Sequence, residues 1–202
     1  MFALLLPVRC PVCAAPGAAP CAGCAATLRP APSLPPPAGV DACLALFAYE
    51  GPARPLVAGL KYRNHRDALA GLAAALAALL PVPPPVDVVT WAPTTPDRRR
   101  ARGFDHAELL ARAVARRVRA PCVGLLDRRP GPAQTGRSGA ERRVGPSLRA
   151  RRPCPPRVLL VDDVATTGAT LAAAAAALRG AGATTVVALV AARTPAPGAA
   201  AG

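Results

Sequence analysis

The sequence predicts an α/β protein with an open parallel sheet, helices on both faces of that sheet, and a small metal-binding module ahead of it. Three observations carry this prediction. Apolar runs of strand length alternate with alanine-rich runs of helical length, which is the order expected for a parallel sheet. Residues 158–161 are apolar without interruption, as in a strand that is buried on both faces. Two Cys-x-x-Cys pairs lie near the N-terminus. We therefore expect two units that fold by different means.

The metal-binding module is expected at residues 1–29, and its candidate ligands are Cys10, Cys13, Cys21 and Cys24. Each pair can place two thiolates of one tight turn at adjacent corners of a tetrahedron, the geometry of a structural zinc site. Disulfide bonds are the alternative, which an expected cytoplasmic location disfavours. About 25 residues cannot form a core alone, so bound zinc would supply the folding free energy of this zinc-ribbon-like module.

The remaining elements follow in chain order from composition and periodicity. Residues 30–39 are rich in proline and should form a stiff, extended linker to the main domain, expected at residues 40–194. Apolar and alternating runs predict strands at residues 40–49, 86–91, 122–126, 158–161 and 185–192. Helical spacing predicts helices at residues 53–62, at 66–80, in a segment that runs through Val118, and after residue 170. We expect a long functional or mobile loop at residues 127–156 and a disordered tail at 195–202.

The charge of the chain is strongly positive and unevenly distributed. The net charge of +14 comes from arginine, since Lys61 is the only lysine. Between Asp97 and Arg152 there are 16 arginines and 5 acidic residues. Such a basic region suits polyanions, including nucleic acid and phosphorylated small molecules. The alternative is compositional, because a GC-rich genome favours arginine, alanine and proline. We expect any contact with nucleic acid to be electrostatic.

The sequence contains no candidate segment for membrane insertion. No apolar run reaches the roughly 18 residues that a membrane-crossing helix requires. The longest apolar helical run, residues 68–80, is shorter and follows two charged residues. The opening segment, residues 1–7, lacks the basic leader of a secretion signal. We therefore expect no membrane insertion and a cytoplasmic location.

The most informative segment is the strand-turn-helix at residues 157–171. Asp162 and Asp163 stand at the carboxyl end of the apolar strand, and small and hydroxyl residues follow. Ligands of parallel sheets bind at this edge, where loop amides and a helix N-terminus can hold an anion. Paired carboxylates suit a vicinal diol, whereas Gly168 and the threonines around it suit a phosphate. The alternative is that Asp163 or a threonine only caps the helix.

This segment resembles the signature of the type I phosphoribosyltransferases, which bind 5-phosphoribosyl-1-pyrophosphate. The resemblance implies a type I phosphoribosyltransferase-like fold for the main domain. It also implies that the carboxylates of Asp162 and Asp163 accept hydrogen bonds from the ribose hydroxyls. The residues that would hold the 5-phosphate are Ala165, Thr166, Thr167, Gly168, Ala169 and Thr170. Hypoxanthine-guanine transferases carry an aspartate at the position of Thr166, so a purine substrate of that class is not expected.

A wider set of motifs resembles the ComF family of bacterial competence-associated proteins. In chain order these motifs are the two Cys-x-x-Cys pairs, Leu60-Lys61-Tyr62, the strand leading to Pro93, Arg102-Gly103-Phe104, Gln134-Thr135 before Arg142, and residues 161–170. The chain departs from the family at two places. Asp105-His106 stands where the family usually has Asn-Gln, and Ala92-Pro93-Thr94 stands where it often has Pro-Val-Pro.

The resemblance also implies cofactors and partners. Mg²⁺ would neutralise the pyrophosphate group of the ligand, and Zn²⁺ would be structural. Lys61 and Arg102 are the candidate contacts to that pyrophosphate. Three functions fit: transfer to an unidentified nucleobase-like acceptor, binding of phosphoribosyl pyrophosphate as a regulatory ligand without turnover, or an accessory role in DNA uptake during natural competence. The last implies single-stranded DNA and a DNA-uptake helicase as partners.

Overall fold

The computed structural model describes residues 9–59, 66–82, 84–128 and 146–196 of the chain. Lys61 lies outside the described residues. So do the motif Gln134-Thr135 with Arg142, most of the predicted loop, and the last six residues of the predicted tail.

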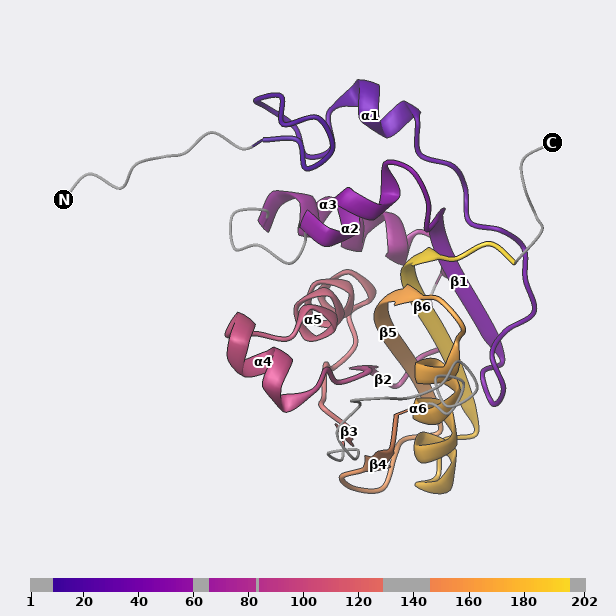
Figure 1. The fold of residues 1–202 in the computed structure, drawn as a ribbon. Coiled ribbons are helices and arrows are strands. Elements are labelled where there is room, and N and C mark those ends of the chain that lie inside the picture. The colour runs from indigo at the N-terminus through magenta and orange to yellow at the C-terminus, as the bar shows by residue number, and fades with distance from the viewer. Residues whose placement is uncertain (1–8, 60–65, 83, 129–145, 197–202) are drawn as a thin grey trace.

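A four-stranded parallel sheet forms the centre of the main domain, with its strands in the order β1-β6-β5-β2 (Figure 1). The strands are β1 Ala42–Ala48, β2 Val88–Trp91, β5 Arg157–Ala165 and β6 Thr185–Arg193. β5 and β6 are the longest of the four and occupy the middle of the sheet. Because all four strands point the same way, their carboxyl ends meet at one edge, where ligands of such sheets bind.

Helices cover both faces of this sheet, as the sequence predicted (Figure 1). They are α2 Ala53–Gly59, α3 Arg66–Ala77, α5 His106–Val118 and α6 Ala169–Gly180. Along β5, Val158 and Leu160 pack in the apolar cluster on the side of α6. Leu159 and Val161 pack in the cluster with α3 and α5. Burial of both sides explains the uninterrupted apolar run. In the part of the chain that the structure describes, no helix combines the length and apolar character needed to cross a membrane.

The strand predicted at residues 122–126 does not form. Cys122 makes only an isolated parallel bridge with Val89, beyond the edge strand β2. Pairing ends there because the N–H of Leu125 donates to the side-chain hydroxyl of Thr90, at 3.2 Å, in place of a strand carbonyl. The apolar run was a correct sign of burial, since Leu125 is 2% exposed, but it does not encode a strand.

Four short elements have no counterpart in the sequence prediction. β3 (Leu126–Arg128) and β4 (Leu148–Ala150) form a separate antiparallel pair that packs beside α6. α4 (Pro96–Arg102) precedes α5, and α1 (Ala22–Ala26) lies in the cysteine module. Each spans seven residues or fewer, which is too short for hydrophobic periodicity to mark it.

The proline-rich residues 30–39 run beside the edge strand β1. Pro30 forms an antiparallel bridge with Phe47 of that strand. The N–H of Ala31 donates to the carbonyl of Leu46 at 3.1 Å. The chain therefore passes from the cysteine module directly onto the sheet (Figure 1).

Candidate functional site

A pocket of about 190 Å³ opens at the carboxyl edge of the sheet. It brings together the ends of β2, β3 and β5 with the first residues of α5 and α6. Its lining residues are Ala92, Pro93, Thr94, Asp105, His106, Ala107, Arg128, Asp162, Asp163, Val164 and Thr170. Three of these, Asp162, Asp163 and Thr170, belong to the predicted site. The pocket therefore lies where the topology of the sheet predicts a ligand site.

The buried strand β5 carries the two adjacent carboxylates into this pocket. Asp162 is 9% exposed, and one of its oxygens accepts the N–H of Asp163 at 2.8 Å. Asp163 is half-buried and accepts the N–H of Val164 at 2.8 Å. Burial raises the pKa of Asp162 well above its usual range, and the negative charges of Asp163 and Asp105 raise it further. The ionised form of Asp162 is therefore stabilised by a ligand that donates a hydrogen bond to it or brings positive charge close to it.

A glycine turn joins β5 to α6 next to the pocket, but its residues 165–169 are not among the residues that line it. Gly168 is the N-cap of α6 and has a φ of 75°, in the left-handed region that favours glycine. It has no side chain with which to satisfy the first N–H groups of the helix. Thr167 accepts the N–H of Ala169 at 3.3 Å, and Thr166 and Thr167 are both exposed. Thr166 and Thr167 thus open one side of the turn to solvent beside the buried Gly168, and the start of a twelve-residue helix is a favourable place for an anion.

The alternative interpretation, that Asp163 or a threonine only caps α6, is only partly correct. Asp163 lies within β5, five residues before the N-cap of α6, so it is not the cap. Thr167 does make one local bond of the capping type. Thr170 lines the pocket. A simple cap therefore does not account for both aspartates and for Thr170.

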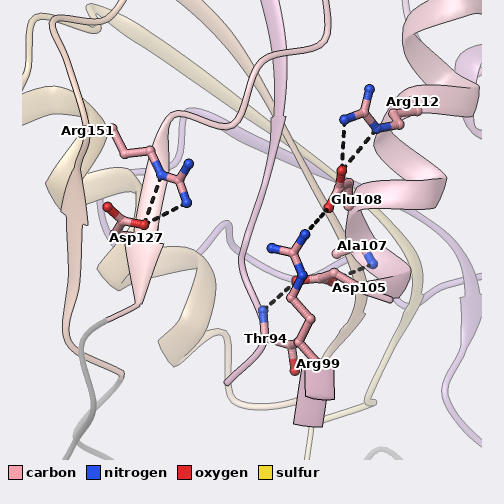
Figure 2. A network of polar contacts seen from close by, with 8 residues as sticks. All are labelled: Thr94, Arg99, Asp105, Ala107, Glu108, Arg112, Asp127 and Arg151. Atoms are coloured by element: carbon pink, nitrogen blue, oxygen red, sulfur yellow. Dashed lines mark hydrogen bonds and ion pairs between the residues drawn. The ribbon is translucent and has the colours of Figure 1, made fainter. Parts of the chain in front are cut away.

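Asp105 fixes the opposite wall of the pocket (Figure 2). It is the N-cap of α5 and accepts the N–H of Ala107 at 3.1 Å. Its other oxygen accepts the N–H of Thr94 at 2.8 Å, which ties the loop after β2 to the helix. Asp105 is 4% exposed, and burial raises its pKa although several backbone N–H groups oppose the shift. An aspartate is therefore structurally suited to this position, where the ComF family usually has asparagine.

Ion pairs hold the surroundings of this wall (Figure 2). Glu108, one turn into α5, accepts from Arg112 at 2.8 Å and lies 3.7 Å from Arg99 of α4. On the separate β3–β4 pair, Asp127 pairs with Arg151 at 2.7 Å. Of these contacts, the one between Arg99 and Glu108 joins α4 to α5, whereas the Asp127–Arg151 pair lies within the β3–β4 unit.

Several residues that line the pocket were not among the predicted site residues. Arg128 lines the pocket and donates to the carbonyl of Pro93 at 3.4 Å, but among so many arginines it has no distinguishing signal. His106 also lines the pocket and is 7% exposed. An aspartate directly before a helical pattern is an N-cap signal that could have located Asp105. Arg102 ends α4, and its contact with pyrophosphate stays a prediction, as does that of Lys61.

The four predicted cysteine ligands come together at the N-terminal module. Their sulfur atoms all lie within 4.8 Å of one another, and those of Cys13 and Cys21 are 3.6 Å apart. Zn–S bonds of about 2.3 Å place the sulfurs of a tetrahedral site roughly 3.8 Å apart, so the cluster fits such an ion. The N–H of Cys21 also points to the sulfur of Cys10, at 3.5 Å.

The pKa values of these thiols favour a bound cation. Burial raises the pKa of Cys10, but N–H donors from Cys21, Cys13 and Val12 outweigh it and lower the pKa to about 6. Side-chain hydrogen bonds with Cys21 and Cys13, followed by burial, raise the pKa of Cys24 to about 12. The arrangement of the four thiols therefore favours ionisation of Cys10 and opposes ionisation of Cys24. A metal ion would remove this conflict, so the cluster could hold one.

We predict that replacing Asp162 by asparagine stabilises the ligand-free protein at neutral pH. Because the folded pKa of Asp162 is raised, the unfolded chain ionises first as the pH rises, which favours unfolding. The stability that protonated Asp162 contributes is complete below about pH 4 and is lost as the pH rises through the folded pKa. Urea denaturation should therefore give similar stabilities at acidic pH and a more stable Asp162→Asn protein at neutral pH. A more stable wild type at neutral pH would contradict this account.

Comparison with known proteins agrees with this geometry. The family model described as "phosphoribosyl transferase domain" matches residues 105–199, which run from the N-cap of α5 through β6. A solved structure described as the allosteric regulatory enzyme of purine biosynthesis is 28% identical, with a TM-score of 0.43. The alignment covers 60% of this chain and 25% of that one, so the chain spans a quarter of that enzyme's length. No curated protein matches. The fold is phosphoribosyltransferase-like, and the domain match supports phosphoribosyl transfer as its general chemistry.

Proposed function

We propose that the pocket at the carboxyl edge binds phosphoribosyl pyrophosphate together with Mg²⁺. One observation carries this proposal: two adjacent carboxylates, Asp162 buried and Asp163 half-buried, lie at the same end of β5 as a glycine turn with exposed threonines. The first suits the ribose diol and the second suits the 5-phosphate. The match of residues 105–199 to a phosphoribosyl transferase domain supports the same ligand.

The electrostatics of the pocket explain why a divalent cation should accompany this ligand. Asp105, Asp162 and Asp163 make the lining acidic, whereas pyrophosphate is strongly anionic. Mg²⁺ prefers oxygen ligands and would neutralise the phosphates while the carboxylates accept from the ribose hydroxyls. Arg128 supplies positive charge on the far side of the pocket. We propose that Lys61 and Arg102 add to it as contacts to the pyrophosphate.

Two outcomes for the bound ligand fit this site, namely transfer and binding without turnover. Transfer needs a nucleophilic acceptor to displace pyrophosphate at the anomeric carbon, with fixed charges to stabilise the departing group. His106 and Asp105 are the titratable groups that line the wall opposite the carboxylate pair. Pyrophosphate release measured over a panel of nucleobases separates the two outcomes, because only a transferase releases it.

We predict that the wild-type protein binds Mg²⁺-phosphoribosyl pyrophosphate and that Asp162→Asn with Asp163→Asn binds it at least about tenfold more weakly. The reason is the loss of two charge-assisted hydrogen bonds, each worth roughly 1.5–3 kcal/mol. Isothermal titration calorimetry measures both affinities. The matched control is Asp97→Asn, an exposed carboxylate on α4 whose side chain is 86% accessible. Absence of binding by the wild type, or equal affinity in the double variant, would overturn the proposal.

We further propose that the metal of the N-terminal cluster is Zn²⁺, because four thiolates at tetrahedral spacing favour it. The purified protein should contain stoichiometric zinc by atomic spectroscopy. Cys13→Ser should lose it, since a serine hydroxyl is a poor zinc ligand. Cys154→Ser is the control, because Cys154 lies outside the cluster and should leave the zinc content unchanged. A metal content that is the same in both variants would argue against this site.

The cysteine cluster and the order of motifs support a ComF-like role, and we propose that the chain assists DNA uptake in the cytoplasm beside a helicase. Outside the cluster, Cys43, Cys122 and Cys154 are free thiols, which suits that compartment. Exposed arginines on α4, α5 and the β3–β4 pair offer contacts to phosphates of single-stranded DNA. They are Arg99, Arg100, Arg112, Arg149 and Arg151.

We predict that binding of a labelled single-stranded oligonucleotide, followed by fluorescence anisotropy, weakens steeply as salt is raised. Contacts to phosphates release counterions, so the logarithm of the affinity should fall linearly with the logarithm of the salt concentration. An affinity that is independent of salt, or no binding at low salt, would contradict this role for the basic surface.

A further inference from the structure

The proline-rich segment lies directly against the glycine turn of the candidate phosphate site. A Cβ atom placed on Gly168 would lie 2.8 Å from Cγ and 3.1 Å from Cβ of the Pro37 ring. Two residues further on, a Cβ atom on Gly39 would lie 3.4 Å from Cβ of Ala175 in α6. The segment therefore packs along α6 from its N-cap to Ala175, and the Pro37 ring contacts the backbone of the turn itself.

A buried arginine holds this segment in place. Arg193, the last residue of β6, is 8% exposed. Its guanidinium donates to the carbonyl of Leu34 at 2.9 Å and to that of Pro35 at 2.5 Å. In the sheet, Arg193 is the register partner of Ala165, the first residue of the predicted phosphate loop. The C-terminal end of β6 therefore lies beside the predicted phosphate loop and also binds the proline-rich segment that packs on that loop.

The segment is fixed on its other side as well. Arg179, near the end of α6, donates to the carbonyl of Gly39 at 2.8 Å and pairs with Asp41 at 2.7 Å. Asp41 in turn accepts the N–H of Val186 in β6 at 2.7 Å. Residues 34–41 are therefore attached to both β6 and α6, the two elements next to the glycine turn.

Proline suits this arrangement for physical reasons. It has no N–H to satisfy, so the carbonyls of the segment remain available to Arg193. Its fixed φ also reduces the entropy that is lost when the segment is held in one conformation. A rigid ring against Gly168 leaves room for no side chain at that position. The left-handed turn at Gly168 and the Pro37 ring are therefore in close contact.

We propose that Pro37 and Arg193 are positioning residues for the phosphate loop: Arg193 fixes residues 34–37, and the Pro37 ring holds the Gly168 turn in its phosphate-binding shape. This inference rests on the proposed function, because it assigns the 5-phosphate to that turn. Preorganised loops bind phosphate without paying for their own ordering. Loss of the ring should therefore weaken binding of the phosphate and spare the rest of the ligand.

The main test compares Pro37→Ala with Pro36→Ala, a neighbouring proline that is exposed. Calorimetry with ribose 5-phosphate should show about tenfold weaker binding for Pro37→Ala and no change for Pro36→Ala. Binding of Mg²⁺-pyrophosphate should be the same in all three proteins, because it does not use the glycine turn. A merely structural role for Pro37 would weaken both ligands together, and that result would overturn the proposal.

A second measurement is independent of any ligand. Hydrogen-deuterium exchange of a peptide covering residues 165–170 should be faster in Pro37→Ala than in the wild type and in Pro36→Ala. If the wild type binds no ribose 5-phosphate, the assignment of the 5-phosphate to the turn fails, and the exchange rates alone decide whether Pro37 holds the turn. Equal exchange in the three proteins would refute the positioning role whatever the ligand.

Variants of Arg193 give a further test. Arg193→Met should weaken ribose 5-phosphate at least as much as Pro37→Ala, and Arg193→Lys should restore part of the affinity. An ammonium group can donate to a carbonyl but lacks the planar fork that spans two. If Arg193→Met does not fold, Arg193→Lys and Pro37→Ala carry the comparison. If Arg193→Lys and Pro37→Ala both bind ribose 5-phosphate with the affinity of the wild type, that result would count against the proposal.

Discussion

The site depends on the burial of Asp162 at the end of a strand that is covered on both sides. A carboxylate in this position is costly, because burial and two neighbouring acids oppose its charge. The cost is tolerated because β5 is anchored by apolar residues on both faces of the sheet. The same strand carries Asp163 and leads into the turn to α6, so one rigid element sets the spacing between the carboxylate pair and that turn. Strain and unfavourable charge of this kind are typical of functional sites.

Sequence reasoning reached the architecture because the central elements obey one pattern each. β5 contains the uninterrupted apolar run 158–161, and α5 and α6 have helical periodicity with residues that cap or end them. The cysteine cluster was equally accessible, since ligand type and spacing specify a site with little dependence on tertiary structure. The wrong strand prediction lies where a side chain replaces a backbone group as hydrogen-bond partner. The hydroxyl of Thr90, which ends the pairing at residues 122–126, is the clearest example.

The site was only half predictable for the same reason. Asp162, Asp163 and Thr170 are contiguous with one motif, whereas Thr94, His106 and Arg128 reach the pocket from three other segments. The sequence marked two of these segments through Ala92-Pro93-Thr94 and Asp105-His106, but it gave no sign of Arg128 or of which segments meet at the pocket. The predicted departures from the ComF motifs gain a physical meaning in the structure. Asp105 joins two walls of the pocket through backbone N–H groups, a task for which an acceptor is required and an amide donor is not.

The pairing of Pro30 and Ala31 with β1 has a consequence for the chain as a whole. β1 is an edge strand of the sheet, and unpaired edges are templates on which other chains can add strands. The residues that follow the cysteine module cover part of this edge, and prolines among them offer no N–H groups to a further strand. The N-terminal region therefore also protects the sheet from self-association. A main domain cut free of it would be exposed to aggregation along β1, even with its pocket intact.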